Sequence, residues 1–268
     1  MSIPKGVRRR AGVAAAVAAL ACGVALAAFT QRPNGADPLE VYQVGVYIGL
    51  QNGVYDGTTT VGELKRHGDF GLGAMNRLDG EMLIVNHLAY RYAPSGAAVR
   101  VRDTDTVPFA IVTTAPRGRG HALASGLRFE AGRPNPFAST VDATLPTVNW
   151  FYAMRIEGVF DSVVARTFPA QVQPYPPVNR VAQDTFRFGR VRGVMVGYRE
   201  PTYVGSSSVP GYHFHFIADD GHGGHVGGHV LSFKISEARL WTSQRPQFRM
   251  AVPQTRAFMR ASLDSVLK

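Results

Sequence analysis

Apolar and polar residues alternate through much of this chain, with the two-residue period of a β-strand that buries one face. The alternation is strongest in residues 211–219 and 228–243, and the glycine-rich segment between them predicts a hairpin. Residues 149–167 predict a strand, a glycine turn and a second strand, and residues 185–199 predict another strand–turn–strand unit. The second half of the chain is therefore expected to form a largely antiparallel sheet.

Strands are also expected in the first half of the chain, together with one well-marked helix. Residues 81–101 predict two strands around a Pro-Ser-Gly turn, and residues 108–114 predict a further strand. Thr60 and Glu63 have the spacing of a capping box, so a short helix should begin there and end at Gly68. A second helix is expected over residues 253–268.

Helices are few and short in this pattern, and strands follow one another directly. We therefore predict an α+β fold of two lobes, each built on a mixed or antiparallel β-sheet. The chain has 268 residues and is 45% hydrophobic, so it can bury a sizeable core. The expected boundaries are a linker over residues 29–38, an N-terminal sheet lobe over 39–147, and a C-terminal sheet lobe with the terminal helix over 148–268.

Residues 1–28 have the pattern of a signal peptide. A basic front with Lys5 and three arginines precedes an apolar run that ends in small residues, so cleavage is expected near Ala27 or Ala28. This pattern predicts export to the periplasm or the medium. An uncleaved membrane anchor is the alternative, since the apolar run is near the lower limit for spanning, but the small residues at its end favour cleavage. A lipid anchor on Cys22 is less favoured, because apolar residues continue beyond the cysteine.

Charge and cysteine content narrow the classes of function. The net charge is +10, and removal of the four basic residues of the predicted leader leaves +6 on the rest of the chain. The remaining arginines are scattered and aromatic residues do not interleave with them, so no nucleic-acid partner is expected. The single cysteine lies in the predicted leader, so the mature chain has neither a disulfide nor a thiolate nucleophile.

Histidines are concentrated in one segment, since five of the eight lie between residues 211 and 233. Because alternate residues of a strand share a face, His213 and His215 should point to one side while Phe214 and Phe216 point into a core. If the next strand pairs with this one, His229 can join the two histidines. Three imidazoles with an open position suit a catalytic zinc ion, and imidazole also suits iron, copper or nickel.

Two alternatives stay open for this cluster. The histidines can instead be solvated, or satisfied by hydrogen bonds within a core. The segment Gly-Gly-His-Val-Gly-Gly-His-Val is nearly duplicated, so His225 competes with His229 for the place of the third ligand. His229 has the better context, because it enters an alternating strand that would hold it rigidly.

Several blocks of the chain, in the same order, resemble the bacterial α-acetolactate decarboxylase family. The resemblance extends from Leu39 to about Phe233, whereas the last 35 or so residues match poorly. The blocks are GVYDG, GELKRHGDFGLG, LDGEMLIV, PFAIVT, FYAMRIEGVFDSVVART, QPYPPV, GVMVGY and VPGYHFHFI followed by GGHVLSF.

The resemblance implies a zinc enzyme that converts 2-acetolactate, a 2-hydroxy-3-keto acid, to acetoin and CO2 without an organic cofactor. The three histidine ligands of the family fall on His213, His215 and His229. The catalytic arginine falls on Arg166 and the catalytic glutamate on Glu81. The sequence leaves open the stereochemistry, the identity of the metal and whether the enzyme is a homodimer.

These residue types agree with the chemistry of a β-keto acid decarboxylation. A metal ion can take up the negative charge that develops on oxygen, and a guanidinium can orient the carboxylate or stabilise the oxyanion. Glu81 begins the apolar run Met-Leu-Ile-Val, where desolvation would raise its pKa towards values useful in proton transfer. Without the resemblance, Glu81 and Arg166 could equally be charges on the exposed face of a strand.

Two other functions are weighed against the decarboxylase. His213, His215 and Asp219 have the spacing of a cupin-like metal-dependent oxygenase or isomerase, although the even strand spacing of a jelly roll is missing. The histidine-rich segment could also belong to a secreted metal-binding protein without catalytic activity. The tail departs from the family, because the position of its final glutamate is Leu267 here and the nearest carboxylate is Asp264.

Overall fold

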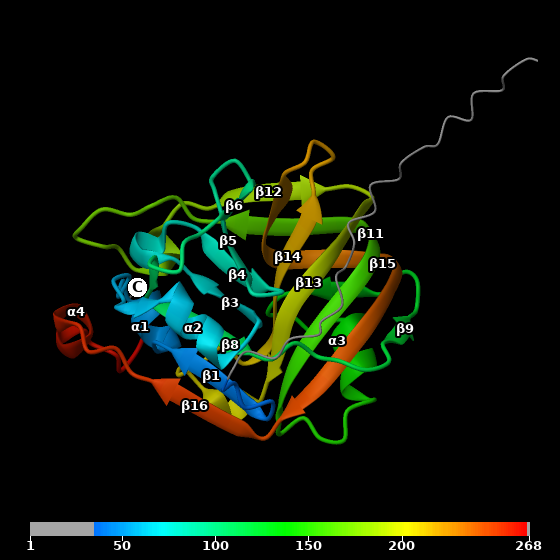
Figure 1. The fold of residues 1–268 in the computed structure, drawn as a ribbon, viewed down its shortest axis with the longest axis horizontal. Coiled ribbons are helices and arrows are strands. Elements are labelled where there is room, and N and C mark those ends of the chain that lie inside the picture. The colour runs from blue at the N-terminus through cyan, green and yellow to red at the C-terminus, as the bar shows by residue number, and fades with distance from the viewer. Residues whose placement is uncertain (1–34, 267–268) are drawn as a thin grey trace, which may run out of the picture.

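The computed structural model describes residues 35–266, so the predicted signal peptide and Leu267 lie outside the described residues. The described chain forms two large β-sheets with few short helices, as Figure 1 shows. This confirms the predicted α+β class. Within residues 35–266 no helix has both the length and the apolar character needed to cross a bilayer.

The first sheet has seven strands and is antiparallel except at one edge, where two strands run parallel. It provides β4, the strand that begins with Glu81. In spatial order its strands are β16 (Gln247–Ala251), β1 (Glu40–Val44), β8 (Phe109–Thr113), β3 (Phe70–Ala74), β4 (Glu81–Val85), β5 (Leu88–Tyr92) and β6 (Ala98–Arg100). A separate two-stranded sheet pairs β2 (Thr59–Thr60) with β7 (Thr106–Val107).

The second sheet also has seven strands, and four of them close into a ring. The first part of β15 pairs with β14, its later part pairs with β11, and β13 joins β14 to β11. The strands are β9 (His121–Leu123), β10 (Arg128–Glu130), β11 (Phe151–Thr167), β12 (Asp184–Phe188), β13 (Val191–Glu200), β14 (Gly211–Asp219) and β15 (His225–Arg245).

The predicted hairpin is confirmed as β14 and β15, whereas the predicted turn in residues 149–167 is wrong. β11 runs without interruption through Gly158. A Cβ atom at this position would lie 2.1 Å from the carbonyl oxygen of Glu237 on β15, so glycine permits a close approach between strands. Gly158 is therefore required for the close packing of β11 against β15, and the chain does not turn there.

Segments on both sides of the predicted lobe boundary near residue 147 belong to the sheet of the other lobe. β9, β10 and helix α3 (Pro136–Asp142) precede that boundary, yet both strands pair with β15, and Phe137 of α3 packs in the second sheet's core. β16 follows the boundary and pairs with β1 of the first sheet. Local sequence patterns predict strands but not which distant strand each one pairs with, so they could not reveal these pairings.

Residues 81–101 form three strands in place of the predicted two. Asn86 and His87 both have positive φ and make a two-residue turn between β4 and β5, the geometry of a tight hairpin connection. The Pro-Ser-Gly turn follows later and leads into β6. An Asn-His pair lacks the glycine that usually signals such a turn.

Helices α1 (Tyr47–Gln51) and α2 (Val61–His67) lie beside the first sheet and the pocket, whereas α3 packs on the second sheet. In α2 the Thr60 side chain accepts a hydrogen bond from the Glu63 N–H, which confirms the predicted cap. Helix α1 follows β1 directly. The tail is predicted as one helix over residues 253–268, but among its described residues, 253–266, only α4 (Arg256–Arg260) is an α-helix. The backbone is extended at its C-cap Ala261, and the helix buries no residue. The short 3-10 helices are Asn76–Leu78, Val178–Arg180 and Thr202–Val204.

Four apolar clusters form the core of the described chain, and two of them connect the fold to the site. The core of the second sheet contains Phe160, Phe214, Phe216 and Phe233, so the predicted inward face of β14 is confirmed. Between the sheets, a second cluster contains side chains from both of them, including Phe70, Leu72, Leu83, Val196 and Tyr198. The two sheets therefore share apolar packing, and their facing strands can hold a site between them.

Glu200 at the end of β13 is a buried carboxyl, only 1% exposed, and it forms no ion pair within residues 35–266. Burial raises its pKa from 4.5 to about 8, and the Ser208 hydroxyl offsets this only in part. The folded protein thus keeps a proton that the unfolded chain loses above pH 4.5. The free energy of unfolding should fall as pH rises from that value to about 8, by roughly 1.4 kcal/mol per unit at most.

The variant Glu200→Gln is expected to remove this decline, because a neutral amide does not titrate. Urea unfolding of parent and variant at intervals from pH 5 to pH 9 measures the difference. Glu237→Gln is the matched control, since Glu237 is exposed on β15. Parallel stability curves for the parent and Glu200→Gln would contradict the prediction.

Candidate active site

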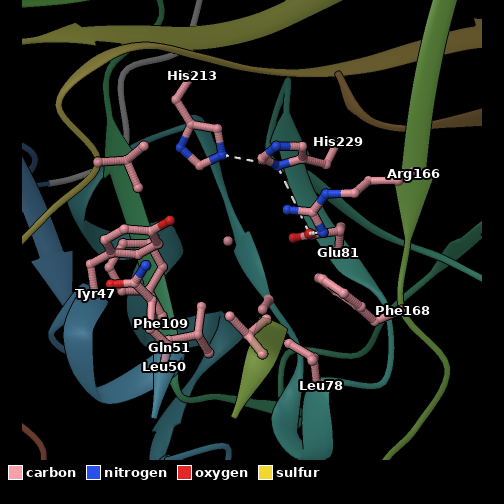
Figure 2. Close-up of a pocket in the computed structure, with 14 residues that line it drawn as sticks. Tyr47, Leu50, Gln51, Leu78, Glu81, Phe109, Arg166, Phe168, His213 and His229 are labelled. Carbon is pink, nitrogen blue, oxygen red and sulfur yellow. Dashed lines mark hydrogen bonds and ion pairs between the residues drawn. The ribbon is translucent and has the colours of Figure 1, made fainter. Parts of the chain in front are cut away.

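The three histidines of the predicted cluster lie together at the junction of three strands. The register pairs His215 on β14 with His229 on β15, and pairs the same His229 with Arg166 on β11. The His213 Nε2 and His229 Nδ1 atoms are 3.2 Å apart (Figure 2). His229 Nδ1 also lies 3.3 Å from His215 Nε2. One nitrogen from each ring lies within 4.8 Å of the others.

Burial keeps these imidazoles neutral. It lowers the pKa of His213 to about 3, with a further contribution from the charge of Arg166, and it lowers the pKa of His215 and His229 well below their ordinary value. His215 Nδ1 is 2.8 Å from the Met82 carbonyl oxygen. A carbonyl only accepts, so Nδ1 has the hydrogen and the lone pair of Nε2 faces the cluster.

This donor set fits a divalent transition metal. Three neutral imidazoles direct ring nitrogens at one another, and His215 is already oriented by a backbone carbonyl in the way that metal-binding histidines commonly are. His213 Nδ1 is buried without a hydrogen-bond partner within residues 35–266. A metal ion on Nε2 of His213 would leave the ring hydrogen on Nδ1, as the Met82 carbonyl does for His215.

The glycines that precede His225 and His229 in the duplicated segment have different surroundings. A Cβ atom at Gly227 would lie 1.9 Å from the Phe216 carbonyl oxygen, and one at Gly228 would lie 2.8 Å from that of Arg166. These two glycines therefore allow β15 to pass closely between β14 and β11 just before His229. Before His225, nothing lies within 4 Å of the equivalent atom at Gly223, and the one at Gly224 meets only the Asp220 side chain of the same turn.

The other polar residues of the segment lie away from the cluster. His225 pairs with Asp219 and its ring contacts Tyr90, with centroids 5.6 Å apart. Asp219 is exposed and accepts a hydrogen bond from the Gly221 N–H. His222 is exposed in the turn. The spacing that suggested a cupin-like site therefore does not bring Asp219 beside His213 and His215.

Glu81 and Arg166 meet beside the histidines, although they come from different sheets. Arg166 Nη1 donates to Glu81 Oε1 at 2.7 Å, and the guanidinium lies 4.3 Å from the Phe168 ring centroid. The two carboxylate oxygens of Glu81 are each 3.8 Å from a histidine nitrogen, one on His215 and one on His229. The structure thus brings together all five residues named from the sequence.

The pKa of the Glu81 carboxyl is higher than that of an exposed glutamate, so the protonated acid is favoured. Burial raises the pKa of this carboxyl, whereas the charge and hydrogen bond of Arg166 lower it. The backbone N–H of Glu81 donates to the Thr167 hydroxyl, which in turn donates to the Tyr92 carbonyl. This fully buried threonine ties β4 to β11 and sets the position of the acid, a role that the sequence pattern did not indicate.

A pocket of about 80 Å³ opens beside these residues. Because one water needs roughly 10–15 Å³ on this measure, the pocket suits a molecule of a few heavy atoms. Figure 2 shows Glu81, Arg166 and His229 on one side and helix α1 on the other. The apolar part of the lining is Leu50, Gly73, Ala74, Leu78, Phe109, Phe168, Val178 and Val209, and its remaining polar members are Tyr47 and Gln51.

The C-terminal tail lies over the helix that forms one wall of this pocket. The Asn52 side-chain amide, at the end of α1, donates to the carbonyl oxygens of Ser262 and Ser265 at 2.9 and 2.8 Å. A Cβ atom at Gly49 would contact the Phe258 ring at 3.7 Å. The expectation for Leu267 itself falls outside the described residues, so the tail glutamate question stays a prediction.

A small pocket with a buried acid, a guanidinium and clustered imidazoles defines an enzyme site for a small molecule. Comparison with protein families makes this specific, because the family model described as alpha-acetolactate decarboxylase matches residues 41–265. The chain belongs to the alpha-acetolactate decarboxylase family. The match extends beyond Phe233, so the expectation of a poor match over the last 35 or so residues is wrong.

Individual relatives agree with the family assignment. The chain is 40% identical to the alpha-acetolactate decarboxylase of Methylococcus capsulatus, over 87% of each chain. It is 35% identical to that of Bacillus subtilis, over 84% of this chain and 86% of the relative. The crystal structure from Bacillus subtilis strain 168 superposes with a TM-score of 0.77, covering 84% of this chain and 94% of that one.

Proposed function

We propose that this protein decarboxylates 2-acetolactate to acetoin and CO2, as a carbon–carbon lyase that uses one divalent transition metal, with zinc the preferred ion. The observation that supports this most directly is the convergence of His213, His215 and His229 beside the Glu81–Arg166 pair. Membership of the decarboxylase family supports the substrate, a small 2-hydroxy-3-keto acid. No organic cofactor is needed for this chemistry.

Breaking the bond to the carboxylate leaves an electron pair that moves to the ketone oxygen, and the carbon then takes a proton. A divalent metal on the three histidines would supply Lewis-acid stabilisation of the substrate oxygens. Arg166 orients the departing carboxylate, since its guanidinium has further N–H groups beyond the one bonded to Glu81. Glu81 in its acid form delivers the proton to carbon. Apart from the polar side chains, the lining of the pocket is apolar.

Two alternative functions have less support. The cupin-like alternative relied on Asp219, which is exposed and distant in register from the histidine that β15 contributes. A non-catalytic metal-binding protein would not need a buried acid–guanidinium pair next to the histidines, or an apolar pocket in front of them.

The proposal is tested by incubating the purified protein with racemic acetolactate and assaying acetoin, with elemental analysis of the same sample. We expect acetoin formation and about one metal ion per chain. Dialysis against a chelator should abolish the activity, and added zinc should restore it, because the histidines alone cannot stabilise the developing oxyanion. Activity in the metal-free protein would contradict the metal requirement, and a metal-loaded protein that forms no acetoin would contradict the decarboxylase.

We further propose that the enzyme is exported after cleavage of the leader near Ala27 or Ala28. The basic front and apolar run of residues 1–28 support this. N-terminal sequencing of the protein recovered from the periplasm or medium tests it. An intact N-terminus on protein that stays in the membrane fraction would favour the anchor instead.

A further inference from the structure

Two polar side chains face the pocket from the wall opposite the proposed catalytic residues. Tyr47 and Gln51 are one helical turn apart on α1 and both line the pocket, in a wall that otherwise consists of apolar groups such as Leu50 and Phe109. Within residues 35–266, no hydrogen bond joins the Tyr47 hydroxyl or the Gln51 amide to another residue. Figure 2 shows the Tyr47 side chain across the pocket from Arg166 and Glu81. Neither residue has a role in the proposed mechanism so far.

The Tyr47 hydroxyl is a donor whose electrostatic partners lie across the pocket. Burial raises the pKa of this phenol, the charge of Arg166 lowers it, and that of Glu81 raises it, so the hydroxyl interacts with both members of the ion pair and stays protonated. A neutral phenol can donate one hydrogen bond. A hydrogen-bond acceptor that enters the pocket between α1 and Arg166 would satisfy this donor.

The position of this hydroxyl is set before any ligand arrives. The Tyr47 ring contacts Phe109 of the first sheet, with centroids 6.0 Å apart. The backbone N–H groups of Tyr47 and Ile48 donate to the Ser207 and Ser206 carbonyls at 3.0 and 2.9 Å, which holds the start of α1. A donor held in this way loses little conformational freedom when it binds, so its hydrogen bond contributes more fully to affinity.

We propose that Tyr47 is a substrate-binding residue, whose hydroxyl donates a hydrogen bond to the carboxylate of the substrate as it lies between α1 and the Arg166 guanidinium. This inference rests on the proposed decarboxylase function and adds the group that selects a carboxylate at that site. Arg166 already donates one N–H to Glu81, so the Tyr47 hydroxyl adds a second donor for the substrate carboxylate beside the remaining guanidinium N–H groups. Once CO2 has left, acetoin offers no carboxylate to this hydroxyl.

The test is the variant Tyr47→Phe, which removes the hydroxyl and keeps the ring against Phe109. We expect the KM for acetolactate to rise about tenfold while kcat changes little. The reason is that the Tyr47 hydroxyl helps to bind the substrate through its carboxylate but takes no part in the proton transfer. Inhibition by 2-hydroxy-2-methylpropanoate, which has the carboxylate and hydroxyl but no ketone, should weaken by the same factor. Inhibition by acetoin should not change.

Tyr203→Phe is the matched control, because the Tyr203 hydroxyl is exposed and bonds the Asn149 carbonyl away from this pocket. Metal content of Tyr47→Phe should equal that of the parent. An unchanged KM, or equal weakening of inhibition by the acid and by acetoin, would overturn the inference while the parent still forms acetoin. Failure of the proposed function is distinct, since the parent itself would then form no acetoin.

Discussion

Replacing His213 with alanine is expected to remove the bound metal and to lower acetoin formation by at least about 10³-fold. The reason is that this side chain provides one of the three imidazoles that cluster within residues 35–266, and the remaining pair cannot complete a three-ligand site. Elemental analysis of the purified variant and the acetoin assay measure the two losses together. Circular dichroism checks that the variant stays folded.

The choice of the third ligand gives this prediction an internal control. His229→Ala should lose metal and activity as His213→Ala does, because His229 Nδ1 is 3.2–3.3 Å from nitrogens of both other histidines. His225→Ala should retain both, since His225 begins the same strand but pairs with Asp219 and contacts Tyr90. Loss of metal in His225→Ala with retention in His229→Ala would place the site one repeat earlier and refute this assignment.

The second large effect is expected from Arg166→Lys, which should keep the metal but lose roughly 10²–10³-fold in turnover. The guanidinium donates to Glu81 at 2.7 Å and lies over the Phe168 ring at 4.3 Å. A planar group with several donors can hold the acid and orient the substrate at once, whereas an ammonium on a flexible stem offers no stacking plane. Steady-state kinetics together with elemental analysis measures both parts of the prediction.

Arg187→Lys is the matched control for this experiment. Arg187 is exposed on β12, the strand next to β11, and it pairs in register with Val164, two residues before Arg166. Its replacement should leave turnover unchanged. Full activity in Arg166→Lys would mean that the guanidinium serves only as a structural partner of Glu81.

Features that depend on neighbouring residues could be predicted from the sequence. Strand alternation correctly placed Phe214 and Phe216 in the core, on the face opposite to His213 and His215, because successive side chains of a strand must point to opposite faces. The capping box correctly located the start of α2, since Thr60 bonds a backbone group three residues away. The family resemblance added Arg166 and Glu81, which periodicity alone could not distinguish from surface charges.

Features that depend on distant segments were decided only by the tertiary structure. His225 and His229 have nearly identical local sequences, and the difference between them arises from the register of β15 against β14 and β11. Gly158 has the local character of a turn, yet it lies within a continuous strand because β15 crosses it closely. Tyr47 has no distinguishing local pattern, and it faces the pocket only because α1 packs opposite Arg166. Local periodicity determined which way side chains point, and packing between strands far apart in the chain decided which of them meet.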